Sequence, residues 1–430
     1  MSRRSSAAGL SPERVTLPNG AVLLAQHNPT TPTVALNATF FTGSVYEPGP
    51  LAGLAYIAAL AIDRGTVRRP GNQLGERFDD LGVSVRSWTT PHTFTVSCVC
   101  LTGDFEEVLG LLTEVIREPL FPDDEIEKRR IEAVTSVKQD DDNPAARATQ
   151  TALELLYGTE HPYGRPIKGT LKTLAQISRQ DVLDYQHDAL TPAALSFVIV
   201  GDVDPQQGID KTAGLLADWR SSGLRQIGVC VTEPGPRTVR FVAMPGKSQS
   251  DIVYAFNTVR RADPRYYGYL VMNHVLGQFG LGGRLADNIR ERQGMAYYAY
   301  STLESSVSEG PLLIRVGVDP LNVDRALDAI DKEVRSLALE GPTRQEFEDS
   351  RHALVGSIPR ILETNDGIAE FLQTVEQFDL GLDHDRRFRE VLATVTIDDV
   401  AEAAREVLQA DRASVAVAGP EPHEAEVSVA

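Results

Sequence analysis

The sequence predicts an α+β fold made of two homologous domains, each a mostly antiparallel sheet packed with helices. The first observation is length, because a chain of 430 residues exceeds what one ordinary hydrophobic core holds. The second is an internal repeat, in which landmarks recur at an offset of about 218 residues. The third is that strand-like and helix-like runs interleave without strict alternation, which favours the α+β class over α/β.

The repeat rests on four landmarks that share one offset, and this agreement is stronger evidence than any single motif. They include an alternating strand near the start of each half and a helix start of an N-cap residue type. Subtracting the numbers gives 218 for each pair: Asp181 with Asp399, Gly201 with Gly419, Val34 to Ala38 with Ile252 to Phe256, and Asp104 with Asn322.

The elements follow in the same order in both halves. The first half opens with two strand-like runs, Ala21 to Gln26 and Thr33 to Phe41. An amphipathic helix is expected from Asp104 to Arg117. The half closes with a strand from Leu195 to Val200, which corresponds to Ser414 to Ala418 at the end of the second half.

The linker between the halves is marked by its composition. Ser221-Ser222-Gly223 and Pro234-Gly235-Pro236 gather the residue types that interrupt helices and strands. We therefore expect an N-terminal domain over residues 1–225 and a C-terminal homologous domain over residues 226–430.

Charge and hydropathy exclude several classes of function. The net charge of −18 and a pI near 4.9 argue against nucleic acid or an anionic membrane as a partner, because both require a basic surface. The first six residues are followed by no apolar stretch of the kind found in a secretory signal. The longest apolar run, Gly53 to Ile62, is too short to span a bilayer. A cytoplasmic protein is expected.

The three cysteines, Cys98, Cys100 and Cys230, are too few and too unevenly placed for a disulfide framework, which fits a reducing compartment. Cys98 and Cys100 share one face of an expected strand and could in principle hold a metal. Nothing nearby completes a zinc set, so a buried structural pair is the favoured interpretation.

Several short motifs, in a fixed order, resemble the zinc peptidases that include pitrilysin, insulysin and the mitochondrial processing peptidase. The resemblance runs over roughly residues 12–420. Its motifs are Gly43-Ser44 to Gly53-Leu54-Ala55, His161-Pro162-Tyr163-Gly164, Gly201 to Pro205, and Arg290 to Tyr297.

The resemblance implies a zinc helix of the form His-x-x-Glu-His, in which two histidines hold the metal and the glutamate serves as general base. Here Tyr56, Ala59 and Leu60 stand at those three positions. The third ligand should be a glutamate some eighty residues later, where Val137 or Ser136 is found. This chain is therefore expected to bind no metal. His274, which is 218 positions after Tyr56, lacks a second histidine at i+4 and is interpreted as a core or surface residue.

The second half keeps two residues of the family's active site, whereas the first half has lost its zinc ligands. In active relatives an arginine and a tyrosine of the C-terminal domain reach the zinc site, and Arg290 and Tyr297 match them in spacing. A tyrosine hydroxyl suits a developing oxyanion, and an arginine can hold a substrate carbonyl or orient the tyrosine. The alternative without function is that Arg290 is a solvated charge at the end of a helix and Tyr297 an ordinary strand residue. The substrate-pairing edge strand of active relatives, Asn-Ala-x-Thr, reads Arg86-Ser87-Trp88-Thr89 here.

These observations favour a non-metal-binding subunit of a heterodimeric zinc metallopeptidase, inactive on its own. A zinc-bearing homologue with an intact His-x-x-Glu-His would be the partner, and a peptide the substrate. The alternative is a catalytically silent scaffold that resembles the core proteins of a respiratory complex. An independently active peptidase would require a zinc site that the sequence does not contain.

Overall fold

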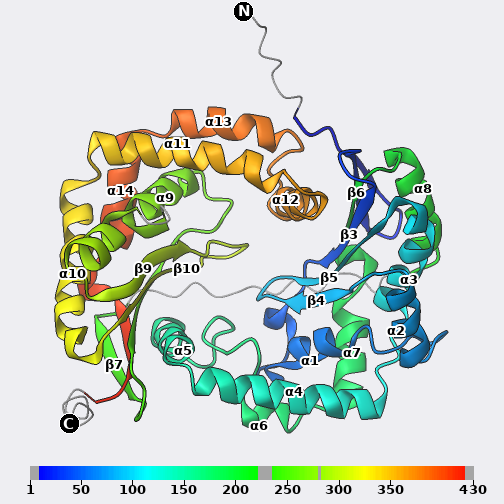
Figure 1. Ribbon diagram of the computed structural model, residues 1–430, viewed down its shortest axis with the longest axis horizontal. Coiled ribbons are helices and arrows are strands. Elements are labelled where there is room, and N and C mark those ends of the chain that lie inside the picture. Colours follow the sequence, from blue (N-terminus) through cyan, green and yellow to red (C-terminus); the bar gives the residue numbers. More distant parts are fainter. Residues whose placement is uncertain (1–8, 221–234, 279–281, 422–430) are drawn as a thin grey trace, which may run out of the picture. The chain divides into compact units, whose positions relative to one another are not determined.

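The computed structural model describes residues 9–220, 235–278 and 282–421 (Figure 1). This part of the chain forms two compact units, which are described separately. The first unit takes its described residues from Met1–Ser136, Pro166–Gly228 and Ile358–Arg387, and the second from Val137–Arg165, Val229–Ser357 and Phe388–Ala430.

The first unit is built on a six-stranded sheet with the strand order β1-β2-β6-β3-β5-β4. Only the pair β2–β6 is parallel, and the other four pairs are antiparallel. Its strands are β1 (Glu13–Thr16), β2 (Val22–His27), β3 (Thr33–Phe40), β4 (Arg86–Thr89), β5 (Phe94–Leu101) and β6 (Leu195–Gly201).

The second unit repeats this topology with five strands in the order β7-β11-β8-β10-β9. Here β7–β11 is the parallel pair, as β2–β6 is in the first unit, and β9 takes the edge position that β4 holds there. The duplication predicted from the sequence is therefore confirmed, as is the mostly antiparallel sheet. The strands are β7 (Thr238–Ala243), β8 (Ser250–Asn257), β9 (Ala296–Leu303), β10 (Pro311–Val318) and β11 (Ser414–Gly419).

The central strands form where the sequence is apolar enough to be buried on both faces. Every residue of β6 and β11 is buried, and the expected runs from Leu195 and Ser414 begin where these strands begin. The helix α3 (Phe105–Arg117) has Asp104 as its N-cap residue, as predicted. Asp104 makes no side-chain capping hydrogen bond, so it is the buried apolar face of α3 that holds the helix in place.

Helices cover both faces of the first sheet. On one face, Gly208 of α8 packs against Ile199, while on the other α12 packs against Val198 and Val200. The helices that lie wholly in this unit are α1 (Leu54–Ala61), α2 (Gly71–Asp80), α3, α6 (Leu171–Leu174), α7 (Arg179–Ala189), α8 (Pro205–Leu216) and α12 (Asn365–Gln377).

The second sheet is packed in the same manner. Ser301 on one face donates its hydroxyl to the carbonyl of Asn273 at the end of α9, and α5 covers the opposite face through Tyr157, which donates to Asn257 at 3.2 Å. The helical elements wholly in this unit are α5 (Pro144–Tyr157), α9 (Tyr266–Asn273), the π-helical segments η5 (His274–Gln278) and η6 (Ala286–Arg292), α10 (Val323–Glu340) and α14 (Ile397–Val407).

The two halves of the sequence exchange one helix each. Helix α5 belongs to the first half of the sequence but packs on β8 and β11, and α12 belongs to the second half but packs on β3 and β6. The division between the units falls within α4 (Asp123–Asp141), α11 (Arg344–Ile361) and α13 (His384–Thr394).

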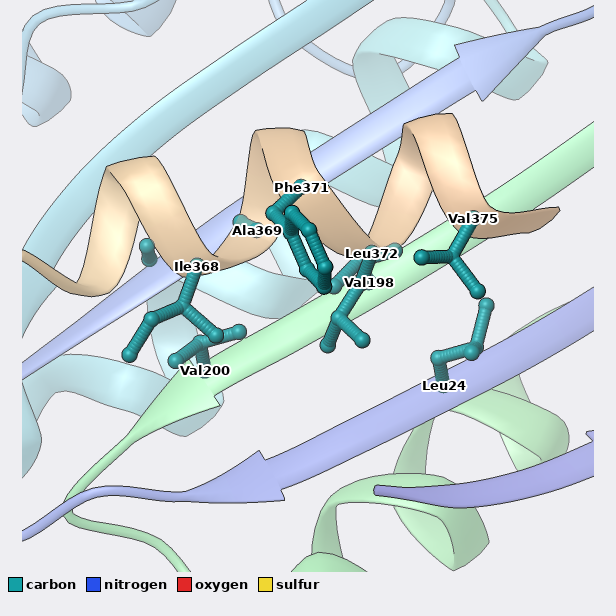
Figure 2. Packing of buried hydrophobic residues seen from close by; sticks show 9 residues of the cluster. Leu24, Val198, Val200, Ile368, Ala369, Phe371, Leu372 and Val375 are labelled. Carbon is teal, nitrogen blue, oxygen red and sulfur yellow. The ribbon is translucent and has the colours of Figure 1, made fainter. Parts of the chain in front are cut away.

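Figure 2 shows the core that α12 forms with the first sheet. The helix turns a stripe of apolar residues toward side chains of β2, β3 and β6, and all of them are buried. A polar contact lies beside this core, because the amide of Gln373 donates to the carbonyls of Asn37 and Ser196, both at 3.0 Å. The apolar residues are Leu24, Ala35, Val198, Val200, Ile368, Ala369, Phe371, Leu372 and Val375.

The predicted linker between residues 220 and 236 lies mostly outside the described residues, so the boundary between residues 225 and 226 stays a prediction. Cys230 lies outside them as well. In the described part of the chain, no helix is long and apolar enough to cross a membrane.

Candidate functional site

Helix α1 carries the three zinc-helix positions of the resemblance. Gly53 precedes it in the left-handed region at φ +96°, where a residue with a side chain would be strained. The buried carboxylate of Glu47 accepts hydrogen bonds from the N–H groups of Gly53 at 3.0 Å and Ala55 at 2.9 Å. These are amides at the start of the helix, where the helix dipole also favours a negative charge. The helix is therefore firmly anchored.

The three positions themselves are occupied by packing residues. Tyr56 and Leu60 are half-buried, and Ala59 is only 1 % exposed. Ser87 of the edge strand β4 donates its hydroxyl to the carbonyl of Ala59 at 2.5 Å. The hydrogen bond joins α1 to β4 at the position where the general base of the family motif would stand.

The third ligand position falls in α4, and Val137 is buried there. Neither a valine nor an alanine or leucine offers an atom that coordinates zinc, and zinc requires thiolate, imidazole or carboxylate ligands. Among the described residues, no group of three or more His, Cys, Asp or Glu side chains is arranged to hold a metal ion. The residues present at these positions do not fit zinc.

Tyr297 lies in the second unit, on the edge strand β9. Its neighbours Ala296 and Tyr298 pair with Val318 and Gly317 of β10, so that Tyr297 is the extra residue of a β-bulge. Bulges often re-aim a side chain next to a functional site. The side chain of Tyr297 is 88 % exposed, the largest exposure among the large hydrophobic residues described. An aromatic side chain left so open is available to a ligand.

Arg290 lies seven residues earlier, in the π-helical segment η6, a rare conformation that is frequently found at functional sites. Its guanidinium donates to the carboxylate of the adjacent Glu291 at 2.9 Å. The chain turns at Gly294 (φ +62°), just after the segment ends, and the N–H of Gly294 donates to the Arg290 carbonyl at 3.1 Å. The backbone of Arg290 is thereby tied to the turn that leads into β9 and Tyr297.

The structure also shows what surrounds Tyr297, which sequence reasoning did not find. Tyr298 and Tyr300 share one face of β9, with ring centroids 5.6 Å apart. The Tyr298 hydroxyl donates to the buried carboxylate of Asp251. The signal in the sequence was an acidic residue inside an otherwise apolar strand, Ser250 to Asn257.

Other residues singled out in the sequence have structural roles. Arg86 of β4 forms an ion pair with Asp366 of α12 at 2.5 Å. Cys98 and Cys100 are buried and free; burial raises the pKa of Cys98 and raises that of Cys100 to about 12. His274 is buried, and burial lowers its pKa to about 4, so its imidazole is neutral at pH 7.

The fold and the site define a class of protein: a duplicated α+β chain of the metallopeptidase type whose zinc-helix positions carry no ligands. Two family models match it, "Insulinase (Peptidase family M16)" over residues 22–171 and "Peptidase M16 inactive domain" over residues 176–354. The chain belongs to the M16 family of peptidases, which confirms the resemblance to pitrilysin and insulysin.

Individual relatives agree with this assignment. The uncharacterised zinc protease YmxG of Bacillus subtilis is 25 % identical over 82 % of this chain and 85 % of its own length. An uncharacterised zinc protease of Mycobacterium leprae is 24 % identical over 95 % of this chain and 91 % of its own.

Solved structures show the same fold. A peptidase M16 inactive domain from Pseudomonas fluorescens has a TM-score of 0.88 at 22 % identity, covering 96 % of this chain and 98 % of its own. A protease from Helicobacter pylori has a TM-score of 0.86 at 15 % identity, covering 96 % of this chain and all of its own.

Proposed function

We propose that this chain is the non-zinc subunit of a two-subunit M16 metallopeptidase, to which it contributes Arg290 and Tyr297. The zinc and the general base belong to a partner, a homologue of similar length that keeps His-x-x-Glu-His, and they supply the attacking water. The observation that carries the proposal is the 88 % exposure of Tyr297 on a bulged edge strand. It stands in a chain whose own zinc positions hold Tyr56, Ala59 and Leu60.

The chemistry of the two side chains supports this role. A tyrosine hydroxyl is a neutral hydrogen-bond donor, and it stabilises the negative charge that develops on a peptide carbonyl oxygen during attack. The guanidinium of Arg290 offers several donors in a fixed plane. It binds a substrate carbonyl or orients the tyrosine, and among the described residues the ion pair of Arg290 is with Glu291 alone, at one edge of that plane.

The proposal extends to substrate and compartment. The partner's site cleaves a peptide, and this chain takes part in binding it. The sparse cysteines, two of them buried and free, support a reducing compartment such as the cytoplasm.

The test is reconstitution. The purified chain is mixed with the homologue from the same genome that keeps His-x-x-Glu-His, and cleavage of a quenched fluorescent peptide library is measured for each alone and for the mixture. We expect cleavage to rise on mixing. In the mixture, Tyr297→Phe should lower kcat roughly 10²-fold to 10³-fold, the range for removing one oxyanion donor.

The matched control is Tyr300→Phe, which removes a hydroxyl from the same strand. It should leave kcat within about threefold of the unmodified mixture. No gain on mixing, or a Tyr297→Phe mixture as active as the original, would contradict the proposal and favour a silent scaffold subunit instead.

A further inference from the structure

Tyr298, the residue that follows Tyr297, belongs to a buried polar cluster with Asp251 and Gln249, and the proposed function gives this cluster no role. The hydroxyl of Tyr298 donates to the carboxylate of Asp251, which is 3 % exposed. The side-chain amide of Gln249 donates to both oxygens of the same carboxylate, at 3.1 and 3.2 Å. Burial raises the pKa of Asp251, and these two hydrogen bonds oppose that effect. A buried carboxylate destabilises a fold unless it is hydrogen-bonded, so its partners hold it strongly.

The register of the sheet explains how the pair meets. Asp251 of β8 is directly opposite Gly317 of β10, and Gly317 is directly opposite Tyr298 of β9. Residues opposite one another point to the same face, and adjacent strands are about 4.8 Å apart. The backbones of Asp251 and Tyr298 are therefore about 10 Å apart. The tyrosine side chain, together with the shorter aspartate side chain that it meets, spans this gap over the strand between them.

Gly317 makes the crossing possible. A Cβ at this position would lie 2.7 Å from Cε1 and 3.0 Å from Cζ of Tyr298, and 2.6 Å from Nε2 of Gln249. These distances are shorter than non-bonded contacts allow, so any side chain at position 317 would push the ring away from Asp251. Gly317, Tyr298 and Asp251 therefore form one contact cluster that extends across three strands.

This cluster lies next to the bulge. The pairing of β9 with β10 shifts between Gly317 and Val318, and Tyr297 is the residue left out of register. An edge strand pairs on one side only, so the position of a bulge depends on local anchors. The hydrogen bond to Asp251 anchors the residue immediately after the bulge, and a slip of one residue would move Tyr298 away from its acceptor.

We propose that Asp251 is a positioning residue for Tyr297: by accepting the Tyr298 hydroxyl across Gly317, it fixes the bulge that projects Tyr297 from the sheet edge. This inference rests on the proposed function, because the role of Tyr297 in cleavage belongs to it. Asp251 does not touch substrate and acts only through Tyr298.

Hydrogen exchange of the chain alone tests the anchor without any partner. Tyr298→Phe keeps the ring and removes the donor, and the amides of residues 296–303 should then exchange roughly 10-fold to 100-fold faster, as expected for loss of a hydrogen bond to a charged group. The matched control is Tyr300→Phe, which removes a hydroxyl on the same face of the same strand and should leave this exchange unchanged.

Kinetics of the reconstituted mixture test the positioning. Tyr298→Phe and Asp251→Ala should lower kcat roughly 10-fold to 100-fold with KM unchanged, because a small displacement of a catalytic group weakens transition-state contacts. Asp251→Asn should lose less than Asp251→Ala, since its amide oxygen still accepts a hydrogen bond. A purely structural role would not give this rescue together with a constant KM.

Each outcome decides the inference. Unchanged exchange in Tyr298→Phe would overturn it whatever the partner does. Faster exchange with an unchanged kcat, in a mixture that Tyr297→Phe impairs, would also overturn it. A mixture with no activity at all would refute the proposed function, and the positioning role would go with it, whereas faster exchange would still establish the Asp251–Tyr298 anchor as structural.

Discussion

The exchange of helices between the two halves makes a strong prediction about stability. Leu372 of α12 is fully buried against the first sheet, although it belongs to the second half of the sequence. Truncating such a leucine to alanine removes its burial and leaves a cavity, at a cost of about 3–5 kcal/mol. Leu372→Ala should therefore destabilise the first unit by about that amount, even though most of this unit comes from residues 1–228.

The two tryptophans provide a probe of the first unit alone. Trp88 and Trp219 are the only tryptophans in the chain, and both belong to that unit. Trp219 packs edge-on against Phe40, with ring centroids 6.2 Å apart, so its fluorescence should respond to unfolding. With a urea m value of roughly 3 kcal/mol/M, the expected loss lowers the fluorescence midpoint by about 1–1.7 M.

The control is the reciprocal helix. Leu156 of α5 is buried in the second unit, so Leu156→Ala should weaken that unit and leave the tryptophan transition in place. A tryptophan midpoint that does not respond to Leu372→Ala would refute the exchange. A midpoint that moves equally in both variants would show that the units unfold as one, against the division described above.

Two further predictions concern buried titratable groups of the first unit. Burial lowers the pKa of His92 to about 4, so the unfolded chain binds a proton below pH 6.5 that the folded chain does not. The contribution of His92 to the free energy of unfolding is therefore fully present above pH 6.5 and falls by roughly 3 kcal/mol by pH 4. Urea unfolding followed by tryptophan fluorescence should show that the His92→Gln variant is less sensitive to pH over that window. In a Cys230→Ser background, Ellman's reagent at pH 8 should label Cys98 and Cys100 only after unfolding, because both are buried and burial raises the pKa of each thiol; rapid labelling of the folded chain would contradict their burial.

The parts of the fold that could be predicted from the sequence are those determined by the local pattern of apolar and polar residues. The strand expected from Thr33 to Phe41 is β3, and the helix expected to follow Asp104 is α3. Burial on both faces selects long apolar runs as central strands, and the repeat offset then places the second copy of each element.

What sequence reasoning could not find depends on contacts between distant residues. An amphipathic pattern shows that α12 buries one face but does not say against which sheet, so the exchange with α5 was not predicted. The bulge at Tyr297 likewise interrupts the regular alternation of side chains along β9. It depends on Gly317 of β10, and no local signal in residues 296–303 reveals a glycine on the neighbouring strand.

The zinc-helix positions of α1 and the bulge of β9 at Tyr297 differ in a way that bears on function. At α1 the position of the family's general base is occupied by a buried alanine, Ala59, whose carbonyl accepts a hydrogen bond from the Ser87 hydroxyl. A glutamate placed there would bury a carboxylate with no hydrogen-bond donor arranged to receive it. At β9 the opposite holds, because Tyr297 stays open while Asp251 and Gly317 hold the strand beside it. This difference supports the proposal that the second unit takes part in a reaction whose zinc is held by a partner subunit.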